Sequence, residues 1–519
     1  MVLRVATFGA YLLFTNSVCS QVIDNAPLTA IDWLSESVEQ PQVLAATPVL
    51  GTKATRSPNA NEAPVANSAI TPDVSVVALS GAKPRVLGLL PSSSTGLPIN
   101  LWHGSDTPIL IELLQAGQID TLPAIQDLFF TLTITQANPP RETSTPDEFF
   151  LARVDKLLDL GALEPAQAML EMASPDTPNL FSRWFDVSLL TGTEDAVCQA
   201  LSNKPDVAPT PSALIFCLAR SSDWSAAALT LNTGLALGDI DAENGALMAR
   251  FLDPDLYDGE QALKLPERTT PLTFRMFEAI GLPLTTSDLP RAFSHADLRA
   301  NVGWKAQLEA AERLSRAGAI SDNALLGLYT ARVPAASGGV WERAKAVNAL
   351  NTALAGNDPE TTNRAVSDLW KEARSVGVAV PLARVFASQL IDADISHEAS
   401  IVFKLLLLSD QYEQAALIED LATTDTFLAA IARGDPSDAL PIHANYLLIQ
   451  DAFVANPDLT LVSMARRGRI GEAILRALAT LQQGIDGDQT AFKEGFATLR
   501  ALGLEDVARR VALQYLLLP

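Results

Sequence analysis

A long succession of short amphipathic segments, from residue 107 to residue 519, is the feature that most constrains this chain. Segments such as DEFFLARVDKLLDL (147–160) and GWKAQLEAAERLSRAG (303–318) carry apolar residues at three- and four-residue spacing, and Gly or Pro follows most of them. This spacing places the apolar residues on one face of an α-helix, and Gly and Pro end helices. No strand-like alternation of comparable strength follows residue 107. The sequence therefore predicts an all-α fold for residues 107–519.

A local pattern recurs within this zone, in which a turn residue is followed by an apolar residue and then by Ala five positions after the turn. It occurs in GALEPA (161–166), SDWSAA (222–227), DQYEQA (410–415) and GRIGEA (468–473), and with a shifted apolar residue in GLEDVA (503–508). These junctions resemble the turn between the two helices of tetratricopeptide repeats, although their spacing is irregular where a regular array holds near 34 residues. The resemblance implies a divergent α-solenoid of helical hairpins. The alternative is a compact multi-helix globule, which so long a helical zone disfavours because single cores stop growing near 250–300 residues.

The first twenty residues (1–20) have the features of a secretory signal peptide. A basic start precedes the apolar run VATFGAYLLF (5–14), and the small residues Val18 and Ser20 stand three and one positions before the expected cleavage point. Two alternatives are a membrane anchor and a lipoprotein attached through Cys19. The apolar run is shorter than the ~20 residues that cross a bilayer, and Val18 stands where lipidation signals have Gly, Ala or Ser. We therefore expect a periplasmic protein with no stable membrane insertion after cleavage.

Two cysteines remain after cleavage, Cys198 and Cys217. Each lies in a helical-looking segment, and the Pro-rich stretch NKPDVAPTP between them can turn the chain back on itself. Exported proteins retain disulfides, so the sequence predicts a Cys198–Cys217 bridge across a helical hairpin. Two separate buried thiols are the alternative. A catalytic cysteine is disfavoured because neither residue has the basic, exposed surroundings that activate a thiol.

The charge balance argues against several classes of partner. The chain has 37 basic and 60 acidic residues, for a formal net charge of −23. Such a field repels nucleic acid and anionic membrane surfaces. Hydrophobic residues make up 48% of the chain but aromatic residues only 6%, so the core consists mainly of Ala, Leu and Val from closely packed helices.

The search for catalytic and metal-binding patterns predicts no enzyme, no metal and no cofactor. The four histidines, His103, His295, His397 and His443, lie far apart and lack partners at metal-ligand spacing. The chain contains no H-E-x-x-H, G-x-S-x-G or phosphate-loop pattern. The acidic stretch FLDPDLYDGE (251–260) places its Asp-Gly one position late for a calcium loop, and helix capping explains it better.

The region before the helical zone divides into two parts. Residues 39–73 are rich in Pro, Ala, Thr and Asn without a helical period, which predicts a disordered linker. Residues 74–106 contain the β-favouring runs VSVVALS and PRVLGLLP, followed by a loop with Trp102 and His103. We expect these residues to form a small irregular or β element that packs against the first helices.

Several stretches carry a wider resemblance: PLTAIDWLSESV (27–38), GLLPSSSTGLP (88–98), FCLARSSDW (216–224), ARFLDPDLYDG (249–259), GWKAQLEAAERLSRAG (303–318) and the terminal GFATLRALGLEDVARRVALQYLLLP (495–519). On these stretches the chain resembles a group of exported alphaproteobacterial proteins of unknown function, sometimes labelled antifreeze glycopeptide-related. The resemblance covers most of the chain, but it implies no activity and no site residues.

Three classes of function remain open. The preferred hypothesis is a periplasmic scaffold whose helical-repeat surface binds another envelope protein or peptide. The alternative is an accessory protein that binds a small molecule or a cell-wall fragment. An enzyme related to the lytic transglycosylases is the least supported, because those enzymes carry a catalytic Glu followed closely by Ser in a separate lysozyme-like domain with a Gly-Leu-Met-Gln run, and the sequence contains no such domain and no such run.

The stretch NAPLTAIDWLSESV (25–38), within the segment 21–38, predicts a short amphipathic helix alone between the signal peptide and the linker. About ten helical residues are marginal in water, so the apolar face needs a groove. The groove belongs either to an envelope partner, which we favour, or to the protein's own helical body. The expected partner-binding residues are four on one face and an aromatic anchor: Leu28, Ile31, Leu34 and Val38, with Trp33.

Replacing both Ile31 and Leu34 with Asp tests this hypothesis. We expect capture of the envelope partner to be lost, because charge on the apolar face prevents docking in a groove, while the melting temperature stays unchanged. The measurement is affinity purification from envelope extract beside a thermal melt. A lower melting temperature with the partner retained would mean that the helix docks on its own chain.

Overall fold

The computed structural model describes residues 86–141, 147–257, 259, 263–356, 358–393 and 398–519. The chain divides into two units, Met1–Leu79 and Ser80–Pro519, and every described residue belongs to the second. The predicted signal peptide, the amphipathic helix with its five candidate residues, the linker and the beginning of the 74–106 element therefore lie outside the described residues.

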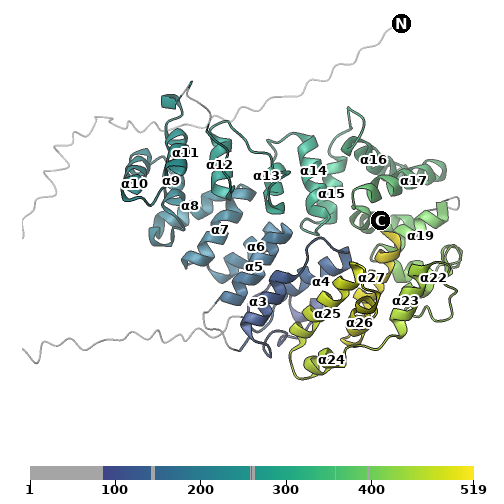
Figure 1. Ribbon diagram of the computed structural model, residues 1–519. Coiled ribbons are helices and arrows are strands. Elements are labelled where there is room, and N and C mark those ends of the chain that lie inside the picture. The colour runs from purple at the N-terminus through teal and green to yellow at the C-terminus, as the bar shows by residue number, and fades with distance from the viewer. Residues whose placement is uncertain (1–85, 142–146, 258, 260–262, 357, 394–397) are drawn as a thin grey trace, which may run out of the picture. The chain divides into compact units, whose positions relative to one another are not determined.

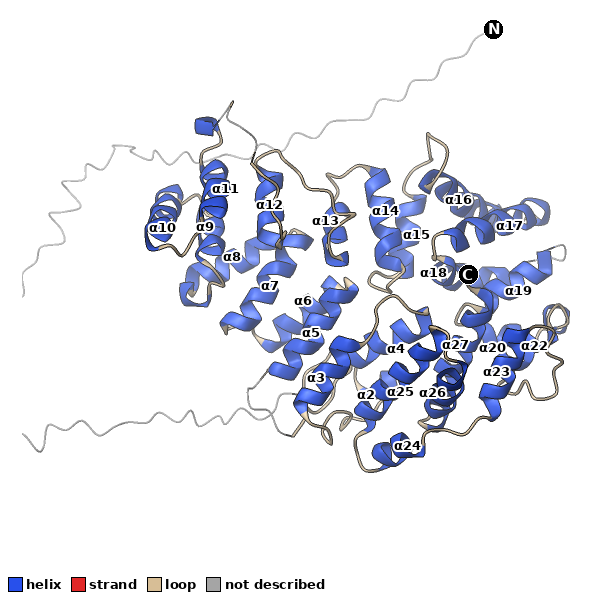
Figure 2. Cartoon of the chain, viewed as in Figure 1, coloured by secondary structure: helices blue, strands red, loops and turns tan. Residues whose placement is uncertain are grey.

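The regular secondary structure in the described part of the chain consists of α-helices and short 3-10 helices joined by loops, without strands, as Figure 2 shows. The helices that begin the body are α2 (Ser92–Thr95), α3 (Thr107–Ala116), α4 (Pro123–Ile134), α5 (Glu148–Leu160), α6 (Leu163–Ala173) and α7 (Pro178–Thr191). Those that follow are α8 (Glu194–Asn203), η2 (Pro205–Val207), α9 (Pro211–Arg220), α10 (Trp224–Leu237), α11 (Ala242–Leu252), η3 (Asp255–Tyr257), α12 (Pro271–Ala279), η4 (Arg291–Phe293) and α13 (Ser294–Asp297). The predicted all-α helical-repeat fold is confirmed.

The second half of the body continues in the same way. Its helices are α14 (Trp304–Ser315), α15 (Asp322–Thr330), α16 (Val340–Gly356), α17 (Pro359–Ser375), α18 (Ala379–Asp392), α19 (Ala399–Leu407), α20 (Tyr412–Ala415), α21 (Glu419–Ala422), α22 (Thr426–Arg433), α23 (Ala444–Val454), α24 (Leu459–Arg466), α25 (Ile470–Ile485), α26 (Gln489–Ala501) and α27 (Glu505–Leu517). Helices that follow one another in sequence pack together in most places, including α5 to α11 and α14 to α17. This nearest-neighbour packing is typical of helical repeats.

The described part of the predicted irregular or β element is irregular. Its β character is limited to two isolated bridges, which join Leu87 to Ala137 and Leu90 to Thr135, and α2 adds one helical turn. Pro91 follows the second bridge and prevents a longer ladder, because Pro lacks a backbone donor.

The residues that punctuate the sequence set the helix boundaries. Asp223, Asp425 and Asp488 each cap the start of a helix, accepting hydrogen bonds from backbone amides of its first turn. Gly161 ends α5 in the left-handed conformation with φ 81°, which a residue with a Cβ adopts at a cost. The hairpin turns predicted from short sequence patterns therefore arise from local backbone chemistry.

Two buried cations on α5 cap the helices that precede it. Arg153 donates to the carbonyl oxygens of Thr133 (2.8 Å) and Thr135 (2.7 Å), where α4 ends. Lys156 donates from Nζ to Gly117 O (2.5 Å), the carbonyl at the end of α3. Burial lowers the pKa of Arg153 to about 10, so the guanidinium still carries its charge at neutral pH. A positive group at a helix C-terminus is stabilising, and these contacts fix α5 across α3 and α4.

The last helices pack against the first ones. Helix α25 contacts α3, and α27 contacts α4, so the purple-blue and yellow ends of the helical body lie side by side in Figure 1. The amide of Ala124 donates to Gln514 Oε1 (2.8 Å), and Gln118 Nε2 donates to Asp486 Oδ2 (3.3 Å). One hydrophobic core includes residues of α3, α4 and α25 to α27. The helical body therefore joins its two ends, a feature that the predicted row of hairpins does not contain.

A close backbone contact, which we call the joint, connects residues 101–105 with residues 468–472. The amide of Gly471 donates to Leu101 O (3.0 Å), and the ring of Trp102, 0% exposed, lies where a side chain on Gly471 would be. A Cβ added to Gly104 would lie 2.3 Å from the carbonyl oxygen of Gly468. Only glycine permits these approaches.

A fully buried carboxylate completes the joint. Glu472 accepts hydrogen bonds from Arg469 (2.6 Å) and Arg476 (3.0 Å). Burial favours the neutral acid, but the two guanidinium groups together hold the pKa of Glu472 below its usual value. The charge is thus paired on both sides, which is the condition under which a buried carboxylate is tolerated.

Trp102→Ala tests how much the joint contributes to the free energy of unfolding. We expect it to lower the free energy of unfolding by about 3–5 kcal/mol, because it opens a cavity against Gly471 and the edge of Phe149. The matched control is Trp224→Ala, whose side chain is 51% exposed and whose loss changes stability by less than about 0.5 kcal/mol. Denaturant unfolding of both variants gives the comparison. Equal losses would contradict the importance of Trp102.

Candidate functional site

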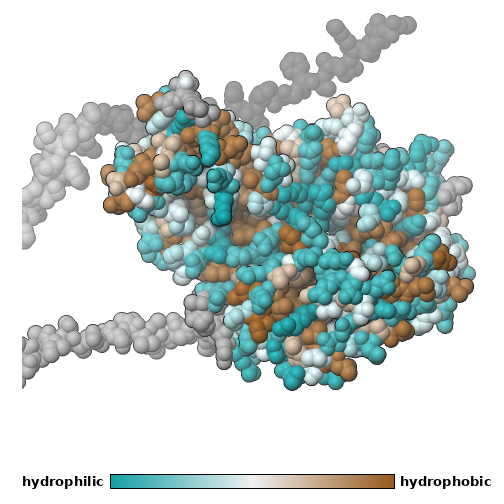
Figure 3. Space-filling view, viewed as in Figure 1, coloured by the Kyte–Doolittle hydropathy of each residue, from teal (hydrophilic) through white to brown (hydrophobic). Residues whose placement is uncertain are grey.

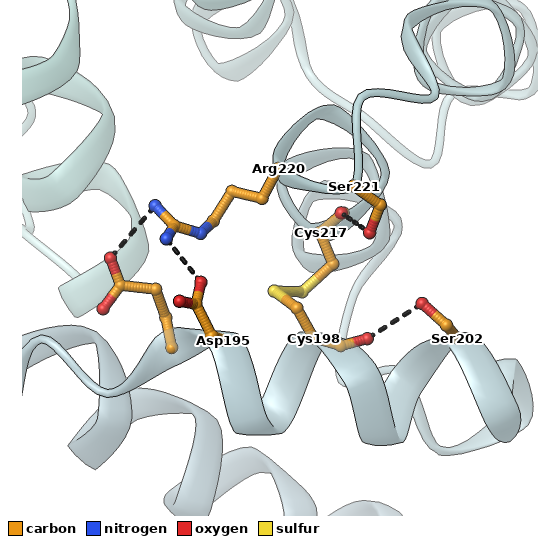
Figure 4. Close-up of a disulfide and its surroundings, with 7 residues drawn as sticks. Asp195, Cys198, Ser202, Cys217, Arg220 and Ser221 are labelled. Atoms are coloured by element: carbon orange, nitrogen blue, oxygen red, sulfur yellow. Dashed lines mark hydrogen bonds and ion pairs between the residues drawn. A yellow bond between two sulfur atoms is a disulfide. The ribbon is translucent and has the colours of Figure 1, made fainter. Parts of the chain in front are cut away.

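Helices α8 and α9 are joined by the predicted disulfide. Cys198 of α8 and Cys217 of α9 form the bridge, with their Cα atoms 4.9 Å apart, and both cysteines are buried (Figure 4). The bridge lies in a hydrophobic core that α7 to α12 share. The alternative of two separate thiols is therefore wrong.

An ionic network surrounds the disulfide and ties α8, α9 and α12 together. Glu194, at the start of α8, is buried and pairs with Arg220 of α9 (3.2 Å) and with Arg275 of α12 (2.8 Å). Figure 4 shows Arg220 also reaching Asp195 beside the bridge. The two cations pair the buried carboxylate from two other helices, and α8, α9 and α12 together form a preorganised frame.

Helix α10 rests on this frame and has no charged residue along its 14 residues, WSAAALTLNTGLAL. Its principal contacts are with α9 and α11. The inward face is buried through Ala227, Leu231 and Gly234, and Gly234 lets Ile240 approach closely. The remaining faces of α10 are therefore presented to solvent.

The solvent side of α10 exposes large apolar side chains. Trp224 is 51% exposed, Leu229 68% and Leu237 71%, and Leu235 is exposed as well. We call these four residues the α10 surface. Figure 3 shows brown, hydrophobic residues gathered where Figure 1 places α10. Single exposed apolar residues are ordinary, but several on one uncharged helix indicate an interaction surface.

Acidic residues border the α10 surface in sequence. Asp223 precedes the helix, and Asp239, Asp241 and Glu243 follow it, all exposed, while residues 221–249 contain no Lys or Arg. Hydrogen bonds from Asn244 hold the pKa of Asp241 below its usual value, so this residue stays ionised at neutral pH. The site therefore combines exposed apolar side chains on α10 with exposed acidic residues just before and after the helix.

The sequence-predicted histidines are not brought together in the structure. His103 accepts a hydrogen bond from Arg141 Nε (2.9 Å), His295 is buried against Gly161 O (2.6 Å), and the ring of His443 lies against Tyr446. Burial lowers the pKa of His295, which favours the neutral ring. His397 and part of the acidic stretch 251–260 lie outside the described residues. No group of metal-ligating side chains occurs in the part that the structure describes.

Comparisons with protein-family models, with curated proteins and with solved structures find no match. The resemblances stated from the sequence therefore stay predictions. Among the described residues no helix has the length and apolar character needed to cross a membrane.

Sequence reasoning missed the α10 surface, although one signal was present. The segment 224–237, which begins within SDWSAA, contains no charged residue, whereas every other described helix of eight or more residues contains at least one. An uncharged helix rich in Leu and Ala is equally typical of a buried core helix. Only the structure, in which α10 packs against α9 and α11, shows that the other faces of this helix are exposed to solvent.

Replacing Cys198 and Cys217 with Ser tests whether the disulfide is needed to hold the helices beneath α10 in place. The bridge closes a loop of 19 residues, and its loss costs about 3 kcal/mol in the chain-entropy model. We expect amide hydrogen exchange to accelerate in α8, α9 and α10 but not in α25 and α26, which have a separate core. Unchanged exchange in α8 to α10 would show that the ion pairs alone hold the frame.

Proposed function

We propose that this chain is an exported periplasmic helical-repeat scaffold that binds another envelope protein or peptide through the α10 surface. The amphipathic segment 25–38 is a separate candidate for the same partner and stays a prediction. The observation that carries the proposal is an uncharged helix that exposes four large apolar side chains, in a chain of formal net charge −23. Export is supported by the signal-like N-terminus and by the disulfide, which persists in oxidising compartments.

The frame beneath α10 supports a binding role. The disulfide and the Glu194 ion pairs hold α8, α9 and α12 without any contribution from a partner. A surface that is already ordered loses little conformational entropy on association. Trp224 adds an amphipathic aromatic side chain of the type that anchors interfaces.

The chemistry of the surface defines the kind of partner. An apolar centre needs an apolar patch opposite it, and the acidic border formed by Asp223, Asp239, Asp241 and Glu243 needs Lys or Arg around that patch. The proposed partner is therefore a protein or peptide with an apolar contact bordered by basic residues. The helical-repeat architecture is consistent with this role, because such arrays present extended binding surfaces.

Paired substitutions test the proposal. Leu229→Glu with Leu237→Glu is expected to abolish recovery of a stoichiometric partner from envelope extract, because it places charge at the apolar centre. The melting temperature should stay the same, since both side chains are mostly exposed. The matched control, Leu440→Glu with Ile442→Glu, changes two equally exposed residues elsewhere and should retain the partner.

Two outcomes would contradict the proposal. A partner that both variant proteins retain would place the interface away from α10. A partner that both lose would show that added negative charge, rather than the α10 surface, controls association.

A further inference from the structure

Helix α24 exposes apolar and basic side chains together. Leu459 begins the helix and is 74% exposed, and Val454, at the end of α23, is 69% exposed. Arg466 ends α24 and Arg467 follows it, and both are exposed. Leu459 and Arg466 are about two helical turns apart, so they lie on the same face of α24. We call Val454, Leu459, Arg466 and Arg467 the α24 surface.

The charge of the α24 surface is positive and is not balanced by neighbouring carboxylates. The side chains of Arg466 and Arg467 make no hydrogen bond or ion pair with any residue that the structure describes, and residues 459–471 contain no Asp or Glu. The flanking acids are engaged elsewhere: Asp458 accepts from amides in the first turn of α24, and Glu472 is paired within the joint. The α24 surface is therefore a local basic area on an acidic chain.

The α10 surface has the opposite charge beside it. Residues 221–249, which include α10, contain no Lys or Arg, and the exposed carboxylates of Asp239 and Glu243 make no hydrogen bond or ion pair with any described residue. Each surface thus combines exposed apolar side chains with unpaired charge, and the two charges differ in sign. Interfaces are arranged so that opposite charges meet, because like charges placed opposite one another are costly. The α24 surface therefore has the chemistry that the α10 surface requires of a partner.

The two surfaces lie in different places on the helical body. Figure 1 shows α10 and α24 well separated, so one copy does not bring its own two surfaces together. A second copy has to supply the opposite surface. Repulsion between two acidic chains does not prevent this contact, because charges more than about 8 Å apart are largely screened at physiological ionic strength. The residues at the contact then determine the sign of the interaction.

We propose that the α24 surface of one copy binds the α10 surface of a second copy, so that the protein assembles head to tail. The proposal rests on the binding role of α10 proposed above and names a second copy as a partner of that surface. Arg466 and Arg467 pair with Asp239 and Glu243, and the exposed apolar side chains of the two surfaces pack together. Because the interface joins two different surfaces, each added copy leaves one of each kind free, and assembly continues to a ring or a filament.

Sedimentation velocity of the full chain at roughly 1 μM and 100 μM tests the assembly over the range of ordinary protein affinities. We expect monomers at the lower concentration and larger species at the higher one. Arg466→Glu with Arg467→Glu should weaken the association at least about tenfold, because acidic residues then face each other. Asp239→Lys with Glu243→Lys should weaken it as much, because basic residues then face each other.

A mixture of the two charge-reversed proteins distinguishes a changed interface from a damaged fold. Alone, each variant places like charges opposite one another, whereas in the mixture every contact between unlike copies joins opposite charges again. We therefore expect the mixture to recover assembly. The matched control is Arg332→Glu with Arg364→Glu, which makes the same change of charge at two exposed arginines elsewhere and should assemble as the unmodified protein does.

Three results would overturn the proposal: a full chain that stays monomeric at roughly 100 μM, an α24 variant that assembles as the control does, or a mixture that stays unassembled. None of them decides the proposed capture of an envelope protein. That function fails separately, if Leu229→Glu with Leu237→Glu retains the envelope partner.

Discussion

The close approach of two glycine-containing stretches, 101–105 and 468–472, is the contact on which the rest of the helical body depends. A side chain on Gly471 would occupy the place of the Trp102 ring, and one on Gly104 would collide with the backbone of Gly468. The buried Glu472 and its two arginines then fix the start of α25. Through this contact the last helices cover α3 and α4, which would otherwise expose apolar faces to water.

The consequences reach the middle of the helical body through α5. Arg153 and Lys156 attach α5 to the ends of α4 and α3, and α5 packs in turn against α6. Successive packing from α5 to α9 then leads to the disulfide and the α10 surface. The helices beneath the α10 surface also have covalent and ionic support of their own, the disulfide and the ion pairs of Glu194.

Local features were predictable from the sequence, and distant contacts were not. Helix boundaries follow from capping residues such as Asp223 and from left-handed Gly161, which act within a few residues. The disulfide followed from two cysteines on either side of a Pro-rich turn. The joint left no such signal, because Trp102 and Gly471 are ordinary residues of a loop and a hairpin until the fold brings them together.

Native-state hydrogen exchange followed by mass spectrometry tests the joint most directly. If the two ends of the helical body form one cooperative unit, α3 and α4 should open with the same free energy as α25, α26 and α27, and should change together as denaturant is added. The opening free energy of this unit should also exceed that of α10, which has few buried residues. Protection of α25 to α27 that persists after α3 and α4 have exchanged would contradict the account.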